Sequence, residues 1–184
     1  MALKRRRYGS LSSLVRRHLS VSDDERTTLL CRKLRAAKRR GYLTKGELVA
    51  VCRWKSARAI NRIRANNHHR IRAATGAALA TRSEQRRLEA LVQLEGVSVP
   101  MASAVLMLVD PKRYGVIDTR VWQLLHAVGA VSENRKGTHF SLENWLQFLS
   151  IVRGLSSRLQ VSARAIERTL FDVHKANQEN RLYA

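Results

Sequence analysis

The sequence predicts an all-α protein of about eight to ten helices. Only two prolines and nine glycines interrupt its 184 residues, and the remaining composition, rich in Ala, Leu and Arg, favours helices over a sandwich or barrel. Ser, Thr or Asp precedes most of the amphipathic segments, as expected of helix N-caps. Hydrophobic residues make up 45% of the chain, which is enough to bury a core. We therefore expect one compact helical domain.

The first half of the chain contains short helices with basic surfaces. Gly41 is a natural C-terminal stop for the second of them. Ser22 with Glu25, and Thr44 with Glu47, have the spacing of capping boxes. The polar cluster at 66–70 is expected to be a loop or helix end. In order, the expected helices are residues 11–19, 25–40, 47–55, 57–66 and 70–80.

The second half contains helices that are more apolar and more closely spaced. Thr81 or Ser83 opens the first of them, and Pro100 occupies a first turn, where proline is tolerated. Asp118, Ser141 and Ser162 stand where N-caps are expected. In order, these expected helices are residues 84–95, 101–110, 118–128, 142–159 and 163–178.

The distribution of charge divides the chain into two unlike halves. The net charge is +21. Residues 1–82 contain 22 basic and 4 acidic residues, whereas residues 83–184 contain 13 basic and 10 acidic residues. An intensely basic half joined to a nearly neutral one predicts a polyanionic partner, and nucleic acid is the favoured one. The alternative is a well-solvated basic surface.

The first twenty residues and the cysteines set further limits. Residues 1–20, which include Lys4-Arg5-Arg6-Arg7, are expected to be a basic arm that touches phosphate, with a single helical domain over 21–184. Cys31 and Cys52 form no Cys-x-x-Cys pair, so a four-thiolate zinc site or a cysteine-ligated iron–sulfur cluster is excluded within one chain. No apolar run is as long as a membrane span. We expect no metal, no cofactor and no membrane contact.

The stretch Leu94–Leu108, "LEGVSVPMASAVLML", has the pattern of a tight turn between two helices at about 85–109. Gly96 and the small Ser98 allow such a turn to expose backbone N–H groups at a helix N-terminus. These groups bind anions without a charged side chain. An ordinary hairpin in the core has the same local pattern, so the turn alone is a weak signal.

Together with Asp118, this stretch resembles the helix-hairpin-helix superfamily of DNA glycosylases, which contains endonuclease-III-like and alkyl-purine enzymes. Members carry a hairpin Leu-Pro-Gly-Val-Gly-x-x-x-Ala and, later, an Asp at the start of a helix, often as Val-Asp-Thr-His. The counterparts here are Leu94-Glu95-Gly96-Val97-Ser98 with Ala102, and Ile117-Asp118-Thr119-Arg120. The resemblance covers about residues 85–130. "CRWKSAR" at 52–58 also resembles a motif of uncharacterised bacterial proteins that have the same hairpin and acid.

The resemblance implies a fold and roles for individual residues. The backbone N–H groups of Gly96, Val97 and Ser98 would bind a DNA phosphate. Asp118 would stabilise positive charge on the sugar as the N-glycosidic bond breaks, or orient the attacking water. The base would first be flipped out of the duplex. Pro100 stands where members with lyase activity carry a Schiff-base lysine, so the hairpin offers no amine and the implied enzyme is monofunctional.

Further candidates come from residue types alone. Trp54 is the candidate for stacking on a flipped base, although a tryptophan is more often part of the core. Asn67 and His68 are candidates for a wedge that fills the gap left by that base, although a solvated loop is the favoured interpretation. The basic residues expected to contact phosphate are Arg53, Lys55, Arg58 and Arg120.

The leading interpretation is a monofunctional DNA glycosylase with Asp118 as its catalytic acid, monomeric, acting on double-stranded DNA in the cytoplasm or on the nucleoid of a bacterial host. The first alternative is a non-catalytic helix-hairpin-helix protein that binds DNA or structured RNA. The second is a basic protein associated with the ribosome or nucleoid. Asp118 is also a good N-cap, and a purely structural role is the competing interpretation of that residue.

Overall fold

A computed structural model describes residues 10–177 of the chain. Over this range the chain forms ten α-helices and one 3-10 helix and contains no strand, which confirms the all-α prediction. The basic cluster at 4–7 lies outside the described residues. The elements are α1 (Leu11–His18), α2 (Glu25–Arg40), α3 (Lys45–Lys55), η2 (Ala57–Ala59), α4 (Ile60–Ala65), α5 (His68–Ala80), α6 (Glu84–Val92), α7 (Val99–Val109), α8 (Thr119–Ala127), α9 (Leu142–Leu159) and α10 (Ala163–Ala176).

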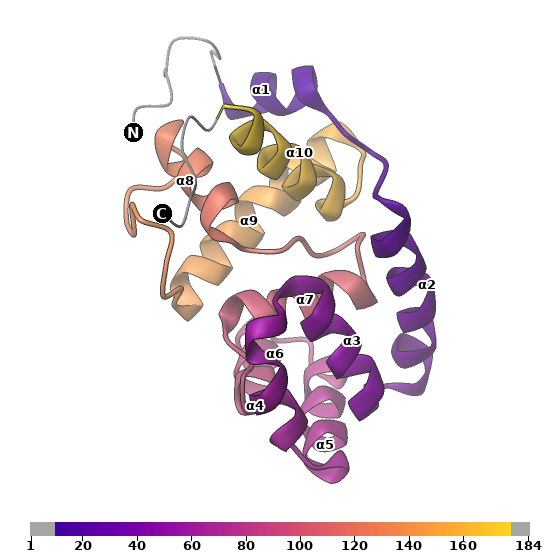
Figure 1. The fold of residues 1–184 in the computed structure, drawn as a ribbon. Coiled ribbons are helices and arrows are strands. Elements are labelled where there is room, and N and C mark those ends of the chain that lie inside the picture. The colour runs from indigo at the N-terminus through magenta and orange to yellow at the C-terminus, as the bar shows by residue number, and fades with distance from the viewer. Residues whose placement is uncertain (1–9, 178–184) are drawn as a thin grey trace.

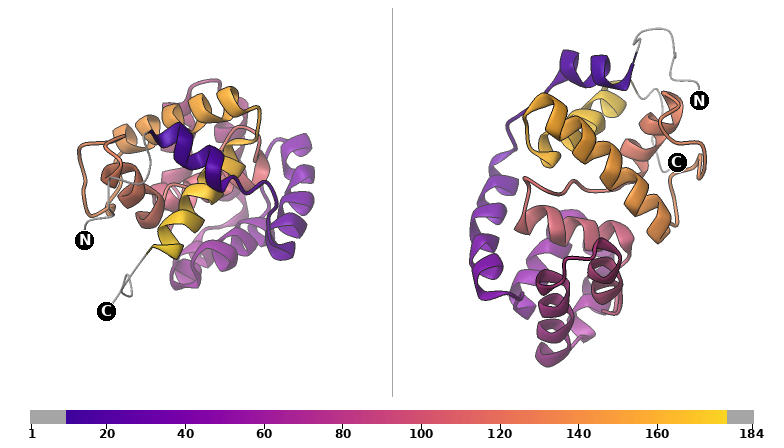
Figure 2. Two further views of the ribbon diagram at one scale, coloured as in Figure 1. Left: turned by 90° about the horizontal axis from the view of Figure 1, so that it is seen from above. Right: turned by 180° about the vertical axis from the view of Figure 1, so that it is seen from behind.

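The helices lie in two groups. Helices α1, α8, α9 and α10 form one group, in which α10 contacts the other three, and α3 to α7 form the second (Figure 1). Helix α2 runs along the side of the molecule from the first group to the second, as the view from behind also shows (Figure 2). The connector between α7 and α8 crosses between the groups (Figure 1).

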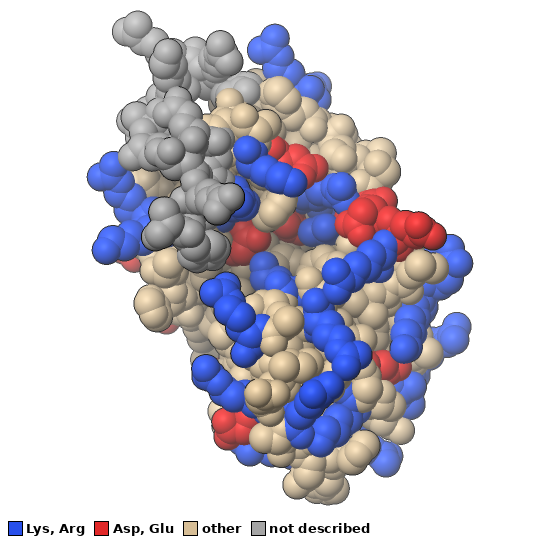
Figure 3. Space-filling view, in the orientation of Figure 1, with Lys and Arg blue, Asp and Glu red and all other residues tan. Residues whose placement is uncertain are grey.

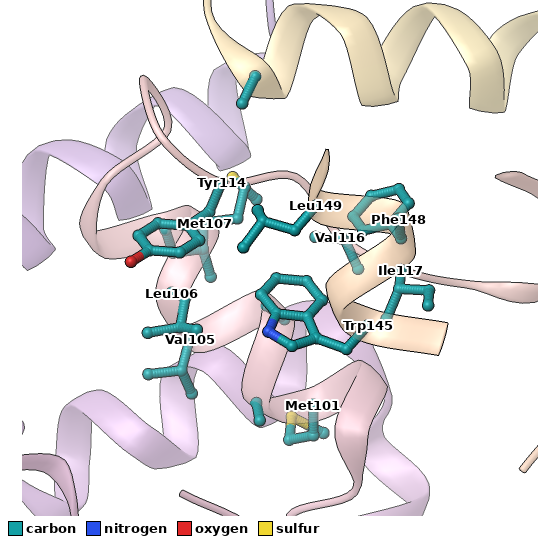
Figure 4. Packing of buried hydrophobic residues seen from close by; sticks show 14 of the residues in the cluster. Met101, Val105, Leu106, Met107, Tyr114, Val116, Ile117, Trp145, Phe148 and Leu149 are labelled. Carbon is teal, nitrogen blue, oxygen red and sulfur yellow. The ribbon is translucent and has the colours of Figure 1, made fainter. Parts of the chain in front are cut away.

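Helix α7 is the central element of the core. Every residue from Met101 to Val109 is buried, so the helix is apolar on all sides, as expected of one enclosed by others. It packs against α2, α3 and α6. Figure 4 shows its side chains meeting those of the connector, including Tyr114, and of α9, including Trp145. The rings of Tyr114 and Trp145 are stacked with centroids 6.3 Å apart.

The connector from 110 to 118 is held in place by backbone bonds to the first helix group. The N–H groups of Ala163 and Arg164 donate to the carbonyls of Lys112 and Pro111, at 3.1 and 3.0 Å. On the other side, the Ile117 N–H donates to Ser103 Oγ of α7 at 3.2 Å. These bonds fix the segment that ends at Asp118.

Most helix starts follow the sequence-based expectation. Thr44 and Glu47 form the expected capping box of α3. Some starts differ. The helix expected over 57–66 begins as the 3-10 turn η2, and α5 begins at His68 and not at residue 70, because Asn67 caps it. Asp24 and not Ser22 is the N-cap of α2, and its Oδ1 accepts the Thr27 N–H at 2.9 Å. A carboxylate directly before the first helical residue caps the helix without the extra residues that Ser22 would add to it.

The described part of the predicted basic arm is packed against the body. Leu14 and Val15 of α1 are fully buried, and α1 contacts α10. The Ser20 N–H also donates to Thr169 Oγ1 of α10 at 3.0 Å. Residues 10–20 therefore belong to the first helix group, which differs from the expectation of an arm extending to residue 20.

Basic side chains spread over the second helix group. Figure 3 shows Lys and Arg over the face formed by this group, while most of the visible acidic atoms lie near the boundary between the groups. None of the described helices is both long and apolar enough to cross a membrane.

Gly96 and Gly41 provide a matched test of the turn between α6 and α7. Both adopt positive φ, +77° at Gly96 and +85° at Gly41, but a Cβ at Gly96 would lie 2.9 Å from Arg62 Cβ, whereas one at Gly41 meets nothing within 4 Å. We expect Gly41→Ala to lower the free energy of unfolding by about 1 kcal/mol from backbone strain alone. Gly96→Ala should lower it by about 2–4 kcal/mol, because overpacking adds to that strain. Urea denaturation of both variants measures the difference, and equal losses would show that the turn does not pack tightly on α4.

Candidate functional site

The turn between α6 and α7 packs against the end of α4. Gly96 takes the left-handed conformation that permits this close approach. The side chain of Asn66, only 1% exposed, braces the turn. Its Oδ1 accepts the Glu95 N–H at 2.9 Å, and its Nδ2 donates to the Glu95 carbonyl at 3.0 Å. Asn66 belongs to the polar cluster at 66–70 that the sequence marked as a loop or helix end, but its side chain is buried and has a structural role in the turn.

A groove of about 480 Å³ lies beside this turn. Ser56, Arg58, Ala59 and Arg62 line one side, and residues 92–98 line the other. Arg58, expected to contact phosphate, therefore faces the turn. Arg62, four residues later, lines the same groove. The i, i+4 spacing of the two arginines is the sequence signal that would have placed them on one side of a helix.

The N–H groups of the turn are only partly available to a ligand. Those of Gly96 and Ser98 donate to no other described residue. The Val97 N–H instead donates to the Leu94 carbonyl at 3.0 Å, and the Val97 side chain is buried. This differs from the expectation that all three residues offer N–H groups to a phosphate. Of the three N–H groups predicted to bind a phosphate, those of Gly96 and Ser98 are therefore the ones left open to a ligand.

Asp118 is both a helix cap and one half of an ion pair. Its Oδ1 accepts the Val121 N–H at 3.1 Å and so begins α8. Its Oδ2 lies 3.3 Å from the Nζ of Lys55, at the end of α3. The two side chains are 18% and 19% exposed. Lys55, expected to contact phosphate, therefore joins the two helix groups at Asp118.

A buried ion-pair network lies behind Asp118. Glu167 of α10 is 2% exposed and is paired with Arg164, whose guanidinium also binds Asp23 at 2.8 Å. Burial raises the pKa of Glu167, the charge of Arg164 opposes that rise, and the charge of Asp118 adds to it. A Cβ at Gly115 would lie 2.6 Å from Glu167 Cβ. Glu167 therefore packs directly against the segment that carries Asp118. The sequence did not reveal that these two acids lie close together.

The side chain of Arg120 in α8 packs against α10, within the first helix group. Its guanidinium lies 5.6 Å from the centroid of the Phe171 ring, and its charge, after burial, is the second cause of a lowered pKa at His174. The expected phosphate contact of Arg120 would compete with this packing. The structure thus places Arg120 away from the turn.

Trp54 and Arg53 lie at a separate groove between α2 and α3. The Trp54 Nε1 donates to Thr27 Oγ1 at 2.9 Å, and the guanidinium of Arg164 lies 5.8 Å from its ring centroid. Trp54 and Arg53 both line a groove of about 600 Å³ whose lining does not include Asp118. Consecutive residues of α3 thus face different neighbours, since Lys55 reaches Asp118.

Asn67 and His68 lie where α5 begins. Asn67 is the N-cap, and its Oδ1 accepts the Arg70 N–H at 2.8 Å. Both side chains are exposed. Arg70 in turn donates to the Gln93 carbonyl at 2.6 Å, which places this corner next to the turn between α6 and α7. Their role as a wedge stays a prediction.

Comparison of the chain with protein-family models, with curated proteins and with solved structures finds no match.

His174 predicts a pH dependence of stability. It is 4% exposed, its Nε2 lies 3.1 Å from Gln123 Oε1, and its Nδ1 has no hydrogen-bond partner among the described residues. Because an amide oxygen only accepts hydrogen bonds, Nε2 carries the proton of the neutral ring and Nδ1 is unprotonated. Burial lowers the pKa of His174 below 6.5, and the charge of Arg120 lowers it further. Below pH 6.5 the unfolded chain therefore binds more protons at this residue than the folded one, so stability falls as the pH falls.

We expect His174→Asn to reduce the dependence of the unfolding free energy on pH between about pH 7 and about pH 5. His69→Gln, at an exposed position of α5, is the control and should leave that dependence unchanged. Urea denaturation across this range measures both variants. An unaltered slope in His174→Asn would contradict a neutral, buried imidazole.

Proposed function

We propose that the chain is a DNA glycosylase of the helix-hairpin-helix superfamily, with Asp118 as its catalytic carboxylate. Three features support the proposal: the resemblance over about residues 85–130, the tight turn at Gly96, and the strongly basic helix group that carries this turn. The proposed partner is double-stranded DNA. We further propose a monomer that acts in the cytoplasm, or on the nucleoid of a bacterial host.

One observation carries the proposal. The four residues 55–58 reach both parts of the proposed site, because Lys55 pairs with Asp118 at 3.3 Å while Ser56 and Arg58 line the groove beside the turn. A strand whose phosphate binds at Gly96 and Ser98 would run along this segment towards the acid. This arrangement suits an enzyme that grips the backbone at one point and acts on a neighbouring sugar.

The chemistry follows from the bond to be broken. Loss of the base leaves an oxocarbenium-like sugar, which a nearby carboxylate stabilises. In this step the base departs with the electron pair of the N-glycosidic bond. Water then adds to the anomeric carbon and loses one proton, and the departed base takes up one proton, so that the products are the free base and an abasic sugar. DNA phosphates would compete with Asp118 for the Lys55 ammonium. In the proposed mechanism, DNA binding thus frees Oδ2 of Asp118 to face the sugar.

Asp118→Asn tests the chemistry apart from the fold. Asn is as good an N-cap as Asp, so α8 should stay intact, whereas base release from duplexes with a panel of damaged bases should fall by about a hundredfold or more. Asp110→Asn is the matched control, because Asp110 also pairs with a lysine, Lys38, at 2.7 Å. Single-turnover base release measures both. Equal activity in Asp118→Asn and the parent, or no base released from any duplex, would reject the enzymatic proposal.

A non-catalytic protein that binds DNA or structured RNA is the second candidate. The observation in its favour is that both carboxylate oxygens of Asp118 already have partners, the Val121 N–H and Lys55. A carboxylate with a purely structural role would make these same two contacts. Binding with a steep salt dependence that is unchanged in Asp118→Asn, without base release, would favour this candidate.

The absence of a lysine from the hairpin predicts hydrolysis without an imine intermediate. Pro100 stands at that position, yet Lys55 brings an amine to Asp118 from α3. We expect no covalent complex when the protein and abasic-site DNA are treated with borohydride, as a monofunctional enzyme requires. Gel electrophoresis detects such a complex. A complex that is lost in Lys55→Ala but kept in Lys38→Ala would contradict monofunctional chemistry and identify Lys55 as the nucleophile.

A further inference from the structure

The groove between α2 and α3 is apolar at its base and open to solvent. Leu29, Leu30 and Ala50 line it together with Trp54, and its volume is about 600 Å³. Leu29 is 51% exposed, which is high for a leucine flanked by other apolar side chains. The groove shares no lining residue with the groove beside the turn at Gly96. It is thus a groove separate from the one beside the turn.

Trp54 is held in a fixed orientation in the wall of this groove. Its indole N–H donates to Thr27 Oγ1 at 2.9 Å, and Thr27 Oγ1 in turn donates to Asp24 Oδ2 at 2.8 Å. A ring fixed in this way loses little conformational entropy when a planar ligand stacks on it. Trp122 and Trp145, the other tryptophans of the chain, are fully buried. Trp54 is therefore the tryptophan that a bound ligand can reach.

The rim of the groove is strongly cationic. Arg26, Lys33 and Arg53 line it with one acid, Glu25. Arg26 is fixed in place by a hydrogen bond from its guanidinium to the Arg53 carbonyl at 2.9 Å. The charge of the rim therefore complements an anionic ligand.

The exposed surface of α2 extends this positive charge along the helix. Arg32, Arg35 and Arg39 follow one another at i, i+3 and i+7, and none forms an ion pair with a described residue. A row of cations along one helix face can follow a phosphodiester backbone.

We propose that this groove binds an unpaired nucleobase of single-stranded nucleic acid. The base stacks on Trp54 over Leu29 and Leu30, and the adjoining phosphates contact Arg26, Lys33 and the arginine row of α2. An acidic amphipathic peptide would match the charge of the rim, but the fixed aromatic wall and the arginines on the neighbouring face of α2 favour a stacked base with its backbone.

Tryptophan fluorescence tests the proposal directly, because Trp54 is the accessible reporter. We expect a short oligothymidylate to quench the fluorescence of the full chain, with a steep salt dependence. Heparin, a polyanion without bases, should bind with little quenching. Trp54→Phe should abolish the nucleotide-dependent quenching, since the two buried tryptophans cannot stack. Equal quenching by heparin and oligothymidylate, or an undiminished signal in Trp54→Phe, would overturn the proposal.

Leu29→Asp and Leu146→Asp form a matched pair of variants. Both introduce one negative charge at an exposed leucine, 51% and 38% exposed, but Leu146 lies in α9 of the other helix group. Loss of base stacking in the groove should weaken oligothymidylate binding by about tenfold in Leu29→Asp, and binding to Leu146→Asp should match the parent. Circular dichroism checks that both variants fold, and Lys33→Glu provides a second variant at the rim.

Equal affinities of Leu29→Asp and Leu146→Asp for oligothymidylate would overturn the proposal. The proposal would also fail if Leu29→Asp no longer bound an acidic helical peptide but still bound oligothymidylate as the parent does. Base release from damaged duplexes should be the same in Leu29→Asp as in the parent, because Leu29 contacts neither Asp118 nor the turn. This control separates the failure of the groove proposal from the failure of the glycosylase proposal.

Discussion

The burial of α7 is the constraint on which the proposed site depends. Met101 to Val109 are buried on all sides of this helix, so the burial of its many apolar side chains, each worth about 1.5–3 kcal/mol, fixes the helix in the core. The turn at Gly96 precedes its first residue, and the connector to Asp118 follows its last. An element that cannot rotate or slide without exposing apolar surface therefore sets the separation between the turn at Gly96 and Asp118. In the proposed enzyme, this fixed separation would let the turn and the acid act on one strand without touching each other.

Several acidic residues form partly buried ion pairs, whereas many of the basic residues lie on the surface. Asp118 pairs with Lys55 between the helix groups, and Asp23 and Glu167 enclose Arg164 behind it. Many of the basic residues of α2, α4 and α5, by contrast, are exposed. The pair of Asp118 with Lys55 thus joins the two groups, while most of the surplus of positive charge stays on the surface of the second group and of α2. Removing the carboxylates would leave buried cations without partners, which costs more than the pairs themselves contribute.

Local signals in the sequence predicted the helices but not the contacts between them. Thr44 with Glu47, Ser141 and Asp118 cap helices where expected, because capping depends on residues within one turn. The pairing of Lys55 with Asp118 joins residues 63 positions apart, and no local pattern encodes it. The same is true of Asn66, whose amide looks like any polar loop residue until the turn at Glu95 is packed against it. The Val97 N–H donates to the Leu94 carbonyl and is not open to a ligand. The sequence could not show this, because that bond depends on the detailed geometry of the turn.

The central claim is that the turn at Gly96 and the carboxylate of Asp118 act on one DNA strand. A crystal structure of the chain bound to a duplex with a stable abasic-site analogue tests it most directly. We expect a phosphate bound by the N–H groups of Gly96 and Ser98, with Arg58 and Arg62 beside it. We also expect the anomeric carbon of the analogue against the Asp118 carboxylate, with the Lys55 ammonium turned towards a phosphate. A duplex bound on another face, or a sugar far from an Asp118 still paired with Lys55, would contradict the account.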